Sequence, residues 1–252
     1  MSALDYSMRH RGINLTGRQK EDVFTFLELG KLINNHHDGV GPLPVDKYKK
    51  LRRGLRKTPL KPDYLQYYKD VAVLEHNRPN PWKTDKDLLN KVAQYRSGTN
   101  LVYWAAACSA AGIASYSELV NHNFDFTDSA PDWFKGMHSL LLALQVTDDK
   151  IGWKGDLRFQ RPSFFTAFCP GEYLKLPPEY LPPIVIQTVF FEMDKHFAVY
   201  LKQAQNKLPG HYALLAATTA LNQVPNLARW KLYEKMQELT GIELVNSRHF
   251  AE

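Results

Sequence analysis

The sequence predicts a mainly α-helical protein, with two helical lobes joined by a proline-rich connection, an N-terminal arm and at most a small hairpin. Apolar residues recur every three or four positions over most of the chain, which is the spacing of one helix face. Thr16 with Gln19, and Ser115 with Glu118, have the spacing of a capping box at the start of a helix. Five prolines between residues 170 and 183 exclude a regular helix there.

These signals divide the chain into four parts. Residues 1–16 form a polar N-terminal arm, residues 17–169 an N-terminal helical lobe, residues 170–183 the proline-rich connection, and residues 184–252 a C-terminal lobe with three helical patterns. Hydrophobic residues make up 44% of the 252 positions, so the chain can bury a sizeable core.

The first part of the N-terminal lobe is predicted to hold three helices. The first covers 17–34 and ends where glycines and prolines follow. The second covers 47–61, with Asp46 as its cap, and combines a narrow apolar stripe with a cationic surface. Asp63 is the predicted cap of the third helix, which continues to Leu74.

The rest of this lobe is predicted to be built around one central helix. It begins at Thr84, has Gly98 as a candidate break, and carries alanines between 105 and 111 that allow a neighbouring helix to approach closely. Pro131 lies in the first turn of a later helix. Residues 147–160 contain two glycines and alternating apolar positions, which favour a small hairpin or an irregular loop.

Charge and cysteine content narrow the class of protein. The formal net charge of +6 favours anionic partners such as nucleic acid. Cys108 and Cys169 are far apart and lack the paired spacing of a zinc site or a disulfide framework, so we expect a reducing intracellular compartment. Glu192, Asp194 and Lys195 interrupt the longest apolar stretch, so we expect no insertion into a membrane.

Familiar catalytic motifs are missing from the sequence. It has no phosphate-binding loop, no dinucleotide-binding glycine motif, no nucleophile elbow and no zinc-protease motif. His36, His37 and Asp38 are adjacent, so their side chains diverge and do not readily share a metal ion. We therefore expect a protein that acts by binding, with no catalytic residue, metal or cofactor. An enzyme of unrecognised type, or a phage factor, is an open alternative.

The segment 47–61 is the most basic part of the chain, with eight lysines and arginines and no acidic residue. Each phosphate that such cations neutralise adds a salt-sensitive increment of affinity, whereas the alternative is a solvated helix face. Exposed aromatic rings among cations can stack on unpaired bases. The residues predicted to contact nucleic acid are Lys49, Arg52, Arg53, Arg56, Arg78, Lys91, Arg96, Lys195 and Lys202, and those predicted to stack on bases are Trp82 and Tyr95.

Four segments follow one another in a characteristic order: YYKDVAVLEHNRPNPW at 67–82, LLNKVAQYRSGTNLVYW at 88–104, RPSFFTAFCPGEYL at 161–174 and FAVYLKQAQNKLPG at 197–210. In these segments the chain resembles the nucleoproteins of phenuiviruses, over roughly residues 63–240. The basic segment 47–61 and residues 147–160 have no counterpart in that resemblance.

The resemblance implies two helical lobes, a positively charged groove for single-stranded RNA, and an N-terminal arm that docks on a neighbouring subunit. The groove residues that it implies are Arg78, Lys91, Lys195 and Lys202 for the phosphates, and Tyr95 and Trp104 for the bases. We therefore predict a viral nucleoprotein that coats single-stranded RNA without sequence specificity and self-assembles through its arm. Its expected locations are the virion and the host cytoplasm, and a viral polymerase is a further candidate partner.

A different class of function is also compatible with the sequence. In an accessory subunit of a large assembly, such as a mitochondrial ribosome or a respiratory complex, basic helices and proline-rich segments pack against neighbouring chains. Its apolar surface patches would then belong to an interface.

Overall fold

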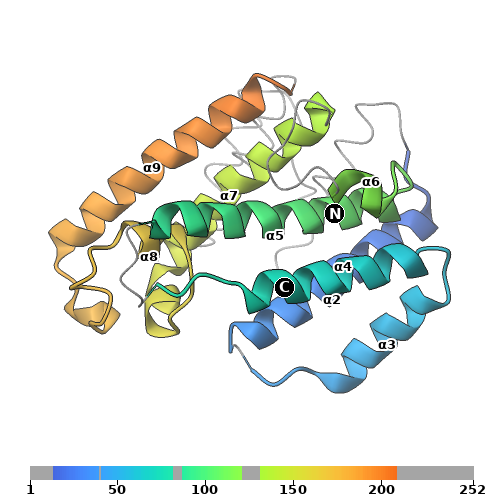
Figure 1. The fold of residues 1–252 in the computed structure, drawn as a ribbon, viewed down its shortest axis with the longest axis horizontal. Helices are drawn as coiled ribbons and strands as arrows, with labels where there is room; N and C mark the ends of the chain where they lie inside the picture. Colours follow the sequence, from blue (N-terminus) through green and yellow to red (C-terminus); the bar gives the residue numbers. More distant parts are fainter. Residues whose placement is uncertain (1–13, 40, 82–86, 121–130, 209–252) are drawn as a thin grey trace, which may run out of the picture.

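The computed structural model describes residues 14–39, 41–81, 87–120 and 131–208. Helices occupy most of this part of the chain and no strand occurs in it, so the predicted mainly α-helical class is confirmed (Figure 1). The elements are α2 (Gly17–His37), α3 (Val45–Arg56), α4 (Lys61–His76), α5 (Leu88–Ala110), α6 (Tyr116–Val120), α7 (Asp132–Arg158), α8 (Phe164–Phe168), the 3-10 helix η1 (Pro178–Tyr180) and α9 (Pro183–Gln205).

Helix α5 lies at the centre of the fold and contacts α2, α4 and α6 as well as α7 and α8 (Figure 1). It is continuous through Gly98, so the predicted break at that residue is wrong. A glycine inside a helix costs about 1 kcal/mol relative to alanine. Burial of Val92, Tyr95 and Leu101 around it outweighs that cost.

Helix α7 runs without interruption through residues 147–158, so the predicted hairpin or irregular loop is wrong. Val146, Asp149, Trp153 and Asp156 are buried at spacings of three and four residues, which place them on one face of a helix. A Cβ atom at either glycine of this stretch would meet no other atom within 4 Å, so neither glycine marks a turn or a close contact. The alternation of apolar residues here was a misleading signal.

Local signals at the helix starts explain several boundaries. The capping boxes of Thr16 with Gln19 and of Ser115 with Glu118 are confirmed by hydrogen bonds in both directions. Ser163 makes a further one at the start of α8.

The two predicted aspartate caps are wrong, because each residue lies inside the first turn of its helix. Pro44 and Leu60 occupy the cap positions of α3 and α4 instead. The Asp63 carboxylate accepts hydrogen bonds from the Ser109 hydroxyl group and the Tyr116 backbone N–H. It therefore joins α4 to the end of α5 and the start of α6.

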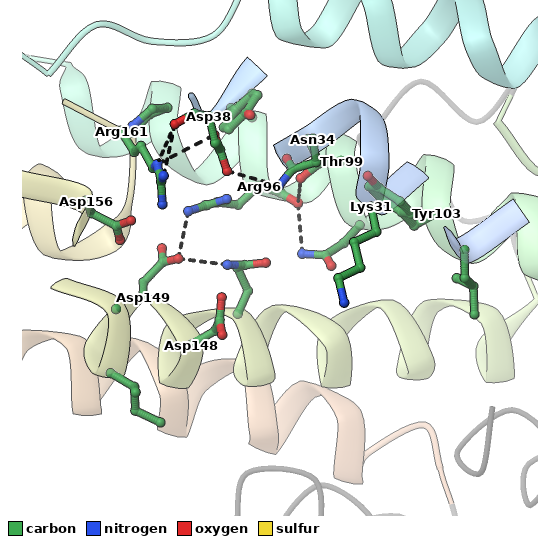
Figure 2. Close-up of a pocket in the computed structure, with 17 residues that line it drawn as sticks. Lys31, Asn34, Asp38, Arg96, Thr99, Tyr103, Asp148, Asp149, Asp156 and Arg161 are labelled. Atoms are coloured by element: carbon green, nitrogen blue, oxygen red, sulfur yellow. Dashed lines mark hydrogen bonds and ion pairs between the residues drawn. The ribbon is translucent and has the colours of Figure 1, made fainter. Parts of the chain in front are cut away.

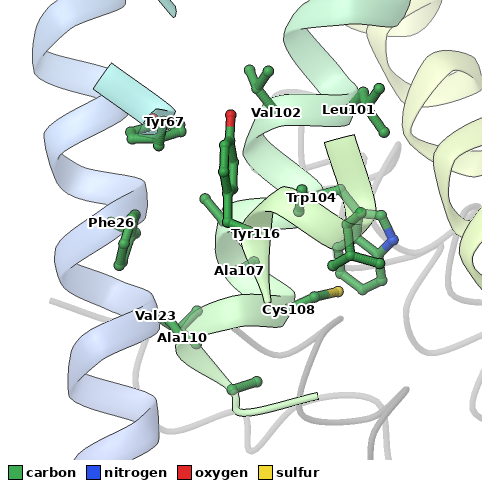
Figure 3. Close-up of a cluster of buried hydrophobic side chains, with 14 of the residues drawn as sticks. Val23, Phe26, Tyr67, Leu101, Val102, Trp104, Ala107, Cys108, Ala110 and Tyr116 are labelled. Carbon is green, nitrogen blue, oxygen red and sulfur yellow. The ribbon is translucent and has the colours of Figure 1, made fainter. Parts of the chain in front are cut away.

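The apolar side chains form two clusters. The first lies between α2, α3, α4, α5, α6 and the start of α7, and includes edge-to-face pairs of Tyr67 with Phe26 and Tyr116 (Figure 3). The second lies between the end of α7, α8, residues 169–181 and α9. Helix α7 contributes to both, with Phe134 in the first cluster and Trp153 in the second.

The proline-rich segment 170–182 consists of turns and η1, and α9 begins immediately after it and packs along α7 (Figure 1). The division into two lobes at this segment stays a prediction. Most of the expected arm, the predicted helix start at Thr84 and the two helical patterns after Pro209 lie outside the described residues. Among the described helices none is long and apolar enough to span a bilayer.

Candidate nucleic-acid interface and a polar cavity

Helix α3 lies at the edge of the molecule, beside α2 and α4 (Figure 1). Its inner side buries Tyr48 and Leu55 in the first apolar cluster. At 100° per residue, Lys49, Arg53 and Arg56 fall in one row about 120° around the helix from these two residues, and Lys50 and Lys57 lie on the opposite side. The exposed cations of this outer face are Lys49, Lys50, Arg53, Arg56 and Lys57, and none of them forms an ion pair with another described residue.

Two other cations of this helix have partners in the fold. Lys47 donates to the Glu28 carboxylate at 2.7 Å, and this contact lowers the pKa of Glu28. Arg52 is half-buried and faces Tyr64 on α4. Burial raises the pKa of the Tyr64 hydroxyl group, and the charge of Arg52 lowers it. Arg52 therefore lies outside the outer face of α3.

The remaining predicted phosphate contacts do not join this surface. Arg78 donates to the His37 backbone carbonyl at 2.9 Å, so it satisfies the end of α2. Lys195 forms an ion pair with Glu192 on α9, which lies across the molecule from α3 (Figure 1). Lys91 and Lys202 are exposed on α5 and α9. The structure therefore does not bring the cations of α3 and α9 into one groove.

The predicted base-stacking residues are packed in the fold where they are described. Tyr95 is buried and donates to the Glu75 carboxylate at 3.0 Å. Trp104 is buried and stacks on Phe134. Trp82 lies outside the described residues.

Tyr68 is an exposed ring that the sequence did not single out. It lies on α4 near Tyr48 of α3, and it adds to the effect of burial in raising the pKa of the Tyr48 hydroxyl group. Helical spacing places it at the border of the buried face that contains Tyr64 and Tyr67. The pattern alone therefore could not separate it from the core tyrosines.

A polar cavity of about 440 Å³ opens between α2, α5 and α7, and its lining includes carboxamide, hydroxyl and charged side chains (Figure 2). No local sequence pattern indicates this cavity, because its lining residues are distributed from position 27 to position 162. The charged residues of the lining are Lys31, Asp38, Arg96, Asp148, Asp149, Asp156 and Arg161.

An ion pair between Arg96 and Asp149 forms part of the cavity wall (Figure 2). The Asp149 carboxylate accepts from the Arg96 guanidinium at 2.7 Å, from the Gln145 amide at 2.7 Å and from the Phe164 backbone N–H at 2.8 Å. Burial raises the pKa of Asp149, while Arg96 and these two other donors pull it down. The pair thus connects α5 and α7 to the start of α8.

Arg161 completes the end of α2 from a distant part of the chain. Its guanidinium donates twice to the Asp38 backbone carbonyl, at 3.2 and 2.9 Å. A cation near the last carbonyl groups of a helix also interacts favourably with the helix dipole. Together with Arg78, it satisfies backbone groups that the helix itself leaves unpaired.

Asp156 is a buried carboxyl group in the wall of the cavity. Burial, reinforced by the negative charge of Asp149, raises its pKa to about 7. A hydrogen bond with Ser163 and the charges of Arg96 and Arg161 act in the opposite direction. This carboxyl group therefore changes its charge near neutral pH.

Other reactive groups give no further site in the described part of the chain. No cluster of three or more histidine, cysteine, aspartate or glutamate side chains there could hold a metal ion. Cys108 and Cys169 are buried thiols that form no disulfide among the described residues, and burial raises the pKa of the Cys169 thiol to about 11. A neutral, buried thiol is a poor nucleophile.

The fold and these two features define a mainly α-helical protein with a cationic surface helix and a polar cavity between its central helices. Comparison of the chain with models of protein families, with curated proteins and with solved structures finds no match.

Proposed function

We propose that the protein binds single-stranded RNA, without reading its sequence, through the outer face of α3. The observation that carries this proposal is the row of exposed cations at Lys49, Arg53 and Arg56, flanked by Lys50 and Lys57, which form no ion pair within the described part of the chain. The row extends over about 10 Å along the helix. Cations that neutralise phosphates release counterions from the nucleic acid, and this release supplies affinity that does not depend on base sequence.

Two features favour RNA over a membrane surface as the anionic partner. A helix that lies on a membrane inserts its apolar face, but the apolar face of α3 is already packed in the core at Tyr48 and Leu55. The exposed Tyr68 ring beside α3 offers a platform on which an unpaired base can stack.

In the fuller form of this proposal the protein is a viral nucleoprotein, which coats RNA and assembles with copies of itself in the virion and the host cytoplasm. The resemblance described above supports this form. The segment expected to dock on a neighbouring copy, residues 1–16, lies almost wholly outside the described residues.

The test is a fluorescence-anisotropy titration with a generic single-stranded RNA at two salt concentrations. The variant combines Lys49→Gln, Arg53→Gln and Arg56→Gln. Removing three phosphate contacts should weaken binding about tenfold or more at low salt and reduce the slope of log affinity against log salt by about 2. The control combines Lys195→Gln with Lys202→Gln and should bind RNA as the unmodified protein does.

Several results would contradict the proposal. They are an unmodified protein without affinity for RNA at low salt, an unchanged affinity in the α3 variant, or an equal loss in the control. Binding to anionic phospholipid vesicles that is lost in the α3 variant, in the absence of RNA binding, would identify a membrane surface as the partner instead.

A second candidate, an accessory subunit of a larger assembly, is favoured by the outer face of α9. Ile184 and Phe191 lie seven residues apart on this face and are 67% and 62% exposed. Clustered apolar side chains on a surface are typical of a protein interface. If this function is the main one, the isolated chain should self-associate, and Ile184→Ser with Phe191→Ser should abolish that association without changing RNA affinity.

A further inference from the structure

The cavity between α2, α5 and α7 has an excess of negative charge. Four carboxyl groups line it, against three cationic side chains. Two of those cations are already used within the wall, because Arg96 donates to Asp149 and Arg161 donates to the Asp38 backbone carbonyl. The third, Lys31, is exposed.

Asp156 points into this cavity (Figure 2). Its residue is only 7% exposed, and no lysine, arginine or histidine within the described ranges forms an ion pair with it. The groups that lower its pKa are the neutral Ser163 and the charges of Arg96 and Arg161, neither of which forms an ion pair with it. A buried carboxylate is costly unless a cation or several donors compensate it, so this group has capacity for a positively charged ligand.

Helix α7 presents Asp148, Gly152 and Asp156 to the cavity at intervals of four residues, which places them in one row. The two carboxyl groups are therefore about 12 Å apart along the helix axis. Gly152 leaves the space between them open, since a Cβ atom there would meet nothing within 4 Å. Ile151 adds an apolar side chain to the same lining.

We propose that this cavity binds a linear polyamine, whose terminal ammonium groups interact with Asp156 at the buried end and with Asp148 at the exposed end. The methylene chain then lies over Gly152 and beside Ile151. A bound ammonium group replaces the missing partner of Asp156, and the length of the row selects a ligand with a charge at each end. This site is independent of the RNA-binding surface on α3.

Lys31 provides a sharp test, because it lies on the wall opposite α7 and its positive charge opposes binding (Figure 2). Replacing it should therefore increase affinity for a polyamine. A gain of affinity cannot result from partial unfolding, so this variant keeps the proposal testable if Asp156→Asn fails to fold.

Isothermal titration of nucleic-acid-free protein with spermidine at pH 8 measures the effect. We expect Asp156→Asn to bind about tenfold or more weakly and Asp148→Asn several-fold more weakly, as loss of a charge-assisted contact requires. Lys31→Gln should bind several-fold more tightly. Glu172→Gln removes an exposed carboxylate outside the cavity and should leave affinity unchanged. The neutral chain 1,8-octanediol should not bind.

The pH dependence supplies a second readout. At pH 6 the Asp156 carboxyl group is mostly protonated, so the unmodified protein should bind spermidine about tenfold more weakly than at pH 8, and Asp156→Asn should lose this dependence. Absence of spermidine binding at millimolar concentration would overturn the proposal. The proposal would also be overturned if Lys31→Gln and both aspartate variants bound spermidine with the same affinity as the unmodified protein.

Discussion

His138 is a buried histidine whose charge couples folding to pH. Its Nε2 atom lies 2.9 Å from the Ser97 backbone carbonyl oxygen, and burial lowers the pKa of the ring to about 4. Between pH 6.5 and 4 the unfolded chain binds a proton that the folded protein does not, so acid should destabilise the fold through this residue by up to roughly 3 kcal/mol. Urea denaturation of the protein and of His138→Gln at several pH values in this range measures the free energy of unfolding. The part of its fall with pH that is due to His138 should be absent in the variant.

Asp156 has the opposite effect on the pH dependence of stability, over nearly the same pH range as His138. Its pKa is about 7 in the folded protein, so between pH 4 and 7 the folded state holds a proton that the unfolded chain has lost, and stability falls as pH rises. The free energy of unfolding of Asp156→Asn, minus that of the unmodified protein, should therefore increase by up to about 4 kcal/mol from pH 4 to pH 7. A difference that does not vary with pH would show that this carboxyl group titrates normally.

Gly30 is required by close packing of aromatic rings. A Cβ atom there would clash with the hydroxyl group of the buried Tyr67 and with the ring of the half-buried Tyr103. Gly30→Ala should therefore destabilise the protein by about 1 to 3 kcal/mol, as overpacking of a core does. Gly54→Ala is the matched control on α3, where a Cβ atom meets nothing within 4 Å, and it should stabilise the protein by about 0.5 to 1 kcal/mol. Thermal or urea denaturation distinguishes the two.

At the scale of elements, the ion pair of Arg96 with Asp149 joins α5, α7 and α8. Replacing Arg96 with methionine leaves the buried Asp149 without its cation, which should cost about 3 to 5 kcal/mol. The double variant Arg96→Met with Asp149→Leu removes both charges and should recover most of this loss. Urea denaturation of the two single variants and the double variant checks this expectation. If the losses of stability in the single variants add up to the loss in the double variant, the two residues are not coupled.

The same element scale shows which parts of the fold could be predicted from the sequence. Capping boxes at Thr16 and Ser115 depend on residues three positions apart, so the sequence alone revealed them. Residues 147–158 were misjudged, because glycines and alternating apolar positions there satisfy the local rules for a hairpin. Packing against α9 and α8 decides their conformation, and that packing is not local.

For a related reason, the sequence points to the outer face of α3 but not to the cavity. The outer face of α3 follows from the spacing of Lys49, Arg53 and Arg56 within one helix, and sequence reasoning included all three. Arg96 was grouped with them by charge, although its partner Asp149 lies 53 residues away. The cavity depends on such distant pairings throughout, so no local pattern pointed to it.

On the scale of the whole molecule, α7 makes the two apolar clusters one structural unit. Because this helix is part of both clusters, neither can unfold without exposing apolar surface of the other. Variants that retain Trp104 or Trp153 as their only tryptophan report on the first and the second cluster respectively. Their fluorescence should give the same urea midpoint, and midpoints that differ clearly would show two independently folding parts.

The bond from Arg161 to the Asp38 carbonyl has a consequence for synthesis of the chain. The two residues are 123 positions apart, so the end of α2 leaves the ribosome long before its partner does. At typical translation rates of about 5 to 20 residues per second, this interval lasts roughly 6 to 25 seconds. During that time the Asp38 carbonyl group at the end of α2 can form hydrogen bonds only with water or with earlier parts of the chain. We therefore expect this end of the helix to be a transient binding site for chaperones.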